Sequence, residues 1–315
     1  MKRTIWWLTS TVLTVLIAAE VTANEQQADQ AGDSQPRPDT SAVPMDTITF
    51  ADGGSTLIEI GGEGPGIIFV SRGSWEHAEM AERLREWYTV VRYVPRWLGA
   101  QGTPLPKDAN RKSTVGDQLP EANQYPFNMN RWPGEVLVSD LHAVADEAGL
   151  GTFVLAGYSG TGRFADSLSG LSERMVGVMI GGIGIAEGYQ YWMGFSEANR
   201  DAKIQDDPDL AFQQHMMALE FDYLDHRDHG AAFKKLPGPK IAWYGGIDGD
   251  PYTLMALQFR GARIAERMRR QTAFLESVGF TVIEMEGEDH NGVFVDTDGS
   301  VTNKLHEALV TQGWK

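Results

Sequence analysis

The sequence predicts an α/β fold in which helices cover both faces of a mainly parallel sheet. Short apolar runs of strand length alternate with segments whose apolar residues recur at helical spacing. Glycine-rich and polar segments follow several of these runs, and the carboxyl ends of strands are where open parallel sheets bind ligands. This alternation begins near residue 45 and continues to the end of the chain.

Turn residues and the spacing of apolar residues predict the strands and the helix of residues 46–94. The turn Asp52-Gly53-Gly54 separates two short strands, and the apolar run 66–70 is typical of a strand buried on both faces. Met80, Leu84 and Trp87 recur at helical spacing. The expected elements of this part are strands at 46–50, 56–60, 66–70 and 89–94 and a helix at 76–87.

An irregular, proline-containing segment at 96–132 interrupts the alternation of strands and helices. Irregular segments of this length in compact domains are often functional. Beyond this segment we expect a strand that ends just before Ser159, strands at 175–180, 240–244 and 281–285, and helices at 135–148, 162–171, 256–278 and 302–311.

The alternation stops between residues 186 and 235, where we expect a helical insertion. Its aromatic cluster either lines a substrate pocket or packs the insertion onto the sheet; the residues are Tyr189, Tyr191, Trp192 and Phe195.

The amino terminus has the pattern of an export signal. Lys2 and Arg3 precede a mostly apolar stretch, and Val21-Thr22-Ala23 offers a small-residue cleavage site. We therefore expect a signal peptide at 1–23, a disordered linker at 24–44 and a single domain at 45–315 of an exported, periplasmic or secreted protein. The alternative, an uncleaved anchor, is disfavoured because the apolar stretch contains several threonines and ends at Glu20.

Composition excludes several kinds of chemistry. The chain has no cysteine, so thiolate metal sites, disulfides and cysteine nucleophiles are excluded. The formal net charge is −16, and −17 without the predicted signal, which argues against nucleic acid and anionic membrane surfaces as partners. The oligomeric state stays open.

Ser159 lies in the segment Gly157-Tyr158-Ser159-Gly160, between an apolar strand and a helix. A sharp strand-to-helix turn of this kind exposes a serine oxygen beside the free amides of a helix N-terminus. The motif usually has glycine two residues after the serine, whereas this chain has Thr161 there and glycine at 162.

Asp248 and His290 also follow predicted strands, in the segments Gly245-Gly246-Ile247-Asp248 and Asp289-His290-Asn291. The chain order serine, aspartate, histidine accompanies the serine elbow in one class of hydrolases. Asp250 is an alternative acid and Glu187 a weaker one. We expect no metal site, because a pair at His226 and His229 has no third ligand.

At these residues the chain resembles the α/β-hydrolase superfamily, in its serine-nucleophile branch, over about residues 46–315. The resemblance implies Ser159 as nucleophile, His290 as base and Asp248 as its partner, with the insertion at 186–235 as a cap. It also implies an oxyanion hole made by the backbone amides of Gly160 and Ser74, although relatives often have His-Gly where this chain has Arg72-Gly73.

The resemblance implies a serine hydrolase that cleaves a carboxylic ester or related acyl bond of a small molecule without a cofactor, and the amino-terminal pattern adds the expectation that it is exported. Two alternatives remain open. One is a non-catalytic binding protein with this fold, and the other is a peptidase, amidase or haloperoxidase-like relative with the same three residues.

Overall fold

The structure is a computed structural model, and it describes residues 45–71, 76–95, 134–203, 205, 208–249 and 263–315. The predicted signal peptide, the linker and the whole of the 96–132 segment lie outside these residues, as do Ser74 and Asp250. Within the described part of the chain, no helix combines the length and apolarity needed to cross a bilayer.

The described strands form one eight-stranded sheet in the order β1-β2-β4-β3-β5-β6-β7-β8. The pairs β1/β2 and β2/β4 are antiparallel, and all other neighbours are parallel, as the sequence predicted. The strands are β1 (Asp46–Thr49), β2 (Ser55–Gly61), β3 (Gly66–Val70), β4 (Thr89–Val94), β5 (Phe153–Tyr158), β6 (Met175–Gly181), β7 (Lys240–Gly245) and β8 (Phe280–Met285).

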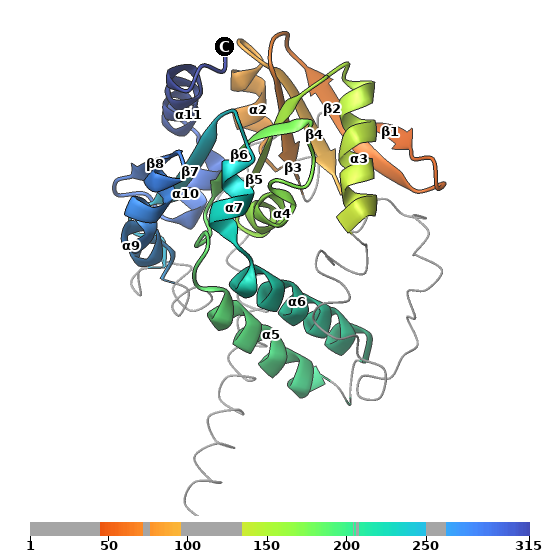
Figure 1. The fold of residues 1–315 in the computed structure, drawn as a ribbon, viewed down its shortest axis with the longest axis vertical. Coiled ribbons are helices and arrows are strands. Elements are labelled where there is room, and N and C mark those ends of the chain that lie inside the picture. The colour runs from red at the N-terminus through yellow and green to blue at the C-terminus, as the bar shows by residue number, and fades with distance from the viewer. Residues whose placement is uncertain (1–44, 72–75, 96–133, 204, 206–207, 250–262) are drawn as a thin grey trace, which may run out of the picture. The chain divides into compact units, whose positions relative to one another are not determined.

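Helices pack on both faces of the sheet (Figure 1). They are α2 (Ala78–Leu84), α3 (Gly134–Glu147), α4 (Gly160–Leu168), α9 (Ile264–Ser277), α10 (His290–Val295) and α11 (Ser300–Thr311). Successive residues of a strand point to opposite faces, so Ile68 joins the core that includes residues of α3, α4 and α9 while Ile67 joins the core with residues of α2 and α11. Strand β3 is therefore buried along its whole length, which explains its uninterrupted apolar run.

Three helices form the insertion between β6 and β7: α5 (Tyr189–Lys203), α6 (Pro208–His226) and α7 (His229–Lys234). Helices α5 and α6 lie side by side (Figure 1). A small core of Tyr189, Phe221 and Leu224 holds them together, with Trp192 packed against it. We refer to α5, α6 and α7 as the cap.

Several helix boundaries differ by a few residues from the sequence expectation, and one short helix was not predicted. Helix α4 begins at Gly160 rather than at 162, because the carbonyl of Ser159 already accepts the first helical hydrogen bond, from the amide of Arg163 at 3.1 Å. The short helix α10 was not predicted. Asp289 caps it by accepting from the amides of Asn291 and Gly292, so an N-cap signal was present in the sequence.

Candidate active site

Ser159 lies at the junction of β5 and α4 with φ 55° and ψ −123°. A positive φ is costly for a residue other than glycine and persists only where the surroundings enforce it. Here the amide of Ser159 donates to the carbonyl of Gly181 in the neighbouring strand at 2.8 Å, and its carbonyl is held by Arg163. The backbone of Ser159 is thus fixed from both sides in the strained turn that the motif predicted.

Thr161 is accommodated in the elbow because its hydroxyl closes the turn. It accepts from the amide of Tyr158 at 3.0 Å and donates to the carbonyl of Tyr158 at 2.8 Å. The glycines that the turn requires are Gly157 and Gly162. A Cβ atom at Gly157 would meet the carbonyl oxygen of Thr161 at 2.3 Å, and one at Gly162 would meet that of Gly181 at 2.9 Å. The departure from the motif therefore leaves the elbow geometry intact.

Asp248 follows β7 in a turn that the protein holds tightly. Its carbonyl accepts from the amide of Ala265 in α9 at 3.0 Å, and its side chain is buried. The turn also runs against the loop that carries His290. The amide of Ile247 donates to the carbonyl of Glu288 at 3.1 Å, and a Cβ atom at Gly245 would meet that same oxygen at 2.4 Å.

His290 is the first residue of α10, and its Nδ1 lies 2.7 Å from Oδ2 of Asp248. Both side chains are buried. Burial raises the pKa of Asp248, and the bond to His290 counteracts part of that increase. The other oxygen of this carboxylate, Oδ1, has no hydrogen-bond partner among the described residues. The contact with His290 is therefore the main support of its negative charge.

The three candidate residues lie at one edge of the sheet. Ser159 follows β5, Asp248 follows β7 and His290 comes after β8, and these strands belong to one parallel block. The structure brings Asp248 and His290 into direct contact. Of the proposed oxyanion donors, Gly160 lies at the start of α4, where a Cβ atom would meet no described atom within 4 Å. Ser74 and Asp250 lie outside the described residues.

Glu187 and the pair His226 and His229 are engaged elsewhere. Glu187 bonds with Arg270 at 2.7 Å and Gln271 at 2.8 Å. His226 is exposed and faces the carbonyl of Asp222 at 2.9 Å. No cluster of three metal-ligating side chains occurs in the part of the chain that the structure describes.

The aromatic residues of the cap divide into interior and surface positions. Tyr189 is only 1% exposed, whereas Phe195 is 41% exposed. Trp192 contacts the rings of Tyr191 and Phe195 edge-on and stacks on Phe221 of α6. Within the cluster, Tyr189 and Trp192 pack α5 against α6 through Phe221. Tyr189 is an interior residue rather than part of an exposed wall.

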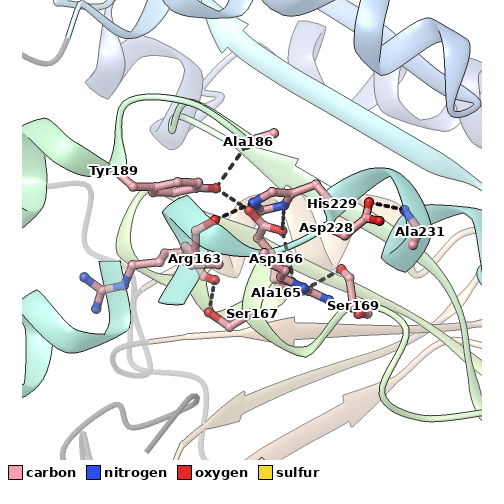
Figure 2. A network of polar contacts seen from close by, with 12 residues as sticks. Arg163, Ala165, Asp166, Ser167, Ser169, Ala186, Tyr189, Asp228, His229 and Ala231 are labelled. Atoms are coloured by element: carbon pink, nitrogen blue, oxygen red, sulfur yellow. Dashed lines mark hydrogen bonds and ion pairs between the residues drawn. The ribbon is translucent and has the colours of Figure 1, made fainter. Parts of the chain in front are cut away.

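A charged network that no sequence pattern predicted lies between α4 and the cap (Figure 2). At its centre is Asp166, fully buried in α4, which accepts from the hydroxyl of Tyr189 and contacts Nδ1 of His229 at 3.2 Å. Arg227 donates to the backbone carbonyls of Asp166 and Ser169. No motif marks these residues, because each lies within or beside a helix and their contacts span more than twenty residues of sequence.

A second buried pair also joins α4 to the cap. The Nε atom of Arg163 lies 3.2 Å from Glu220 of α6, and its guanidinium lies 4.7 Å from the ring centre of Phe221. Burial raises the pKa of Glu220, against the opposing effect of Arg163. The helix that begins at the elbow is thus tied to the cap at two places.

No family model and no curated protein sequence matches the chain. Solved structures do. An esterase from Thermogutta terrifontis matches with a TM-score of 0.53 and 15% identity, over 85% of this chain and 99% of the esterase. An enol-lactonase from Burkholderia xenovorans LB400 matches with a TM-score of 0.49 and 16% identity, over 85% of this chain and all of that one. An epoxide hydrolase from Vigna radiata matches with a TM-score of 0.49 and 14% identity, over 86% and 99%.

The esterase comparison and the strand order agree with what the resemblance in the sequence predicted. A mainly parallel eight-stranded sheet lies between helices and carries a helical insertion after β6. The chain has the α/β-hydrolase fold.

Proposed function

We propose that this protein is a serine hydrolase in which Ser159 is the nucleophile, His290 the general base and Asp248 the partner of His290. The observation that carries the proposal is the buried Asp248–His290 bond at the same sheet edge as a serine held at positive φ. The elbow exposes a nucleophile, and the bonded pair provides a base whose ring orientation is fixed.

In the proposed reaction, Nε2 of His290 takes the proton of the Ser159 hydroxyl while Oγ attacks the carbonyl carbon of the substrate. The tetrahedral intermediate collapses to an acyl-serine, and His290 returns the proton to the departing alcohol. Water then attacks the acyl-serine with His290 again as base. Asp248 holds the Nδ1–H tautomer and stabilises the imidazolium that forms in each step.

The backbone amide of Gly160, at the N-terminus of α4, is the proposed donor to the developing oxyanion. By resemblance, the second donor is the amide of Ser74. Backbone donors do not depend on the side chain, so Arg72-Gly73 in place of His-Gly is compatible with this role.

A carboxylic ester is the proposed substrate class, because a serine of this kind attacks carbonyl carbon and the carbonyl carbon of an ester is more electrophilic than that of an amide. The structural neighbours include enzymes described as an esterase, an aryl esterase and carboxylesterases, together with a lactonase and epoxide hydrolases. They support hydrolysis in general. We also propose that the protein is exported, on the basis of the pattern at residues 1–23, and that its reaction needs no cofactor.

The test is labelling with a fluorophosphonate probe, which reacts with activated serines whatever the natural substrate. We expect the wild type to be labelled and Ser159→Ala to remain unlabelled. Absent labelling of the wild type would favour a binding protein with this fold, and labelling that persists in the variant would exclude Ser159. A series of p-nitrophenyl esters of increasing chain length would then define the acyl group.

A further inference from the structure

Tyr158 connects the elbow to the loop that carries His290. It precedes Ser159 directly, yet its hydroxyl donates to the backbone carbonyl of His290 at 3.0 Å, a contact across 132 residues of sequence. Its ring also lies against the imidazole of His290, with 4.9 Å between the ring centres. The side chain next to the candidate nucleophile therefore touches the candidate base in two ways.

The position of the Tyr158 ring is tightly constrained. A Cβ atom at Gly182 would lie 2.4 Å from the ring, and one at Gly181 would lie 2.5 Å from it. Trp243 of β7 lies on another side, with ring centres 5.8 Å apart. The backbone of Tyr158 is fixed in turn by the hydroxyl of Thr161. The ring has little freedom to move away from His290.

We propose that Tyr158 is a positioning residue that sets the location of His290 relative to Ser159. The inference rests on the proposed function, and it assigns Tyr158 no contact with the substrate. Because Tyr158 and Ser159 are adjacent in the chain, a bond from the Tyr158 hydroxyl to the backbone of His290 links nucleophile and base through one rigid side chain. A displacement of the base by an ångström would slow proton transfer markedly.

The charge state of the tyrosine suits this role. Burial, followed by the negative charges of Asp248 and Asp289, raises the pKa of Tyr158 well above its usual range. The hydroxyl therefore keeps its proton at neutral pH and remains a donor to the carbonyl of His290.

The test is the kinetics of fluorophosphonate labelling in Tyr158→Phe, because this needs no knowledge of the natural substrate. The dependence of the rate on probe concentration separates probe binding from the maximal rate of serine attack. Loss of one hydrogen bond from the base should lower the maximal rate about 3- to 10-fold, with the binding constant of the probe unchanged. The pH profile of labelling should shift as well, because the environment of His290 changes.

Tyr244→Phe is the matched control. Tyr244 is a buried tyrosine of β7 whose hydroxyl donates to Glu284 at 2.8 Å. Its loss should alter stability without altering the maximal labelling rate. A variant with 3-fluorotyrosine at position 158 retains the hydroxyl and should label at close to the wild-type rate.

The outcomes separate the two proposals. If the wild type is not labelled, both proposals are overturned. If the wild type is labelled but Tyr158→Phe reaches the same maximal rate and pH profile, only the positioning role is overturned.

Discussion

Two buried histidine–aspartate pairs occur among the described residues, and they differ in what surrounds them. In one, Nδ1 of His290 lies 2.7 Å from Asp248 at the sheet edge. In the other, Nδ1 of His229 lies 3.2 Å from Asp166, between α4 and the cap. The same two residue types thus occur in similar contact, yet only the first pair is proposed to take part in catalysis.

The second ring nitrogen accounts for this difference. Nε2 of His229 lies 2.8 Å from the carbonyl of Leu224, so both nitrogens of this ring face acceptors and both must carry protons. Burial lowers the pKa of His229, but Asp166 and the carbonyl of Leu224 raise it more, and the net pKa is raised. A ring held as an imidazolium cannot accept a proton from a serine.

The pKa values of the two aspartates are also shifted in different directions. Burial raises the pKa of Asp166, but His229, Arg227 and Tyr189 lower it more, so that the net pKa is lowered. Among the described residues, His290 alone offsets the effect of burial on Asp248, and the net pKa of Asp248 is raised. The Asp166 pair is thus fixed in its ionised form, as suits a structural tie between α4 and the cap. Proximity of histidine to aspartate does not by itself indicate catalysis.

The largest expected effect comes from Asp248→Asn. The wrong tautomer of His290 should lower the labelling rate of Ser159 about 10⁴-fold, with folding retained because the amide has nearly the same shape. The labelling rate is measured from reactions quenched at successive times, and retention of the fold is measured by urea unfolding. Asp250→Asn is the matched control and should lose far less activity. The reverse order would identify Asp250 as the partner of the base.

Asp166→Asn should lower stability strongly and the labelling rate of Ser159 little, the opposite of Asp248→Asn. Removal of one buried charge leaves His229 and Arg227 without compensation, and we expect a loss of about 3–5 kcal/mol of unfolding free energy. The labelling rate per folded molecule should stay within about threefold of wild type. A larger loss of rate per folded molecule would imply that Asp166 acts on the reacting groups. A large rate loss at unchanged stability would contradict the distinction between the pairs.

His229→Gln tests the charge of the second pair through pH. Because the folded-state pKa of His229 is raised, its stabilising contribution is fully present below its ordinary pKa of 6.5 and is lost as pH rises through the folded-state value. The facing groups are Asp166 of α4, Tyr189 of α5, Arg227 beyond α6 and the carbonyl of Leu224.

Asp166 has a lowered pKa and stays charged in this range. Urea unfolding of the wild type and His229→Gln should therefore differ by about 1.5–3 kcal/mol at acidic pH, and the difference should shrink in alkaline solution. A gap that widens with pH would show that His229 is neutral in the folded protein.

The smallest expected effect is that of Tyr189→Phe. The hydroxyl donates to Asp166 and accepts from the amide of Ala186 at 3.2 Å. Its removal should cost about 0.5–1.5 kcal/mol of unfolding free energy without changing the maximal labelling rate. Comparison with Tyr158→Phe is informative, since both tyrosines are buried donors but only Tyr158 contacts the residue of the proposed base.

The sequence by itself determined the sheet and the location of the candidate residues. Burial on both faces imposes an apolar run on β3, and the strained turn imposes Gly157 and a small-residue pattern around Ser159. Asp248 and His290 stood out because each follows a strand end. These features depend on neighbours along the chain, and local pattern is therefore sufficient to predict them.

Only the tertiary structure decided which other side chains meet. The sequence already paired Asp248 with His290 through the resemblance, but it did not predict that Asp166 meets His229, 63 residues away, or that the Tyr158 hydroxyl reaches His290 across 132 residues. Asp166 and His229 lie in helices with no distinguishing motif. Thr161 departs from the elbow motif in sequence, and only the structure shows that its hydroxyl closes the turn. Such contacts depend on how distant elements pack, and no local pattern encodes that packing.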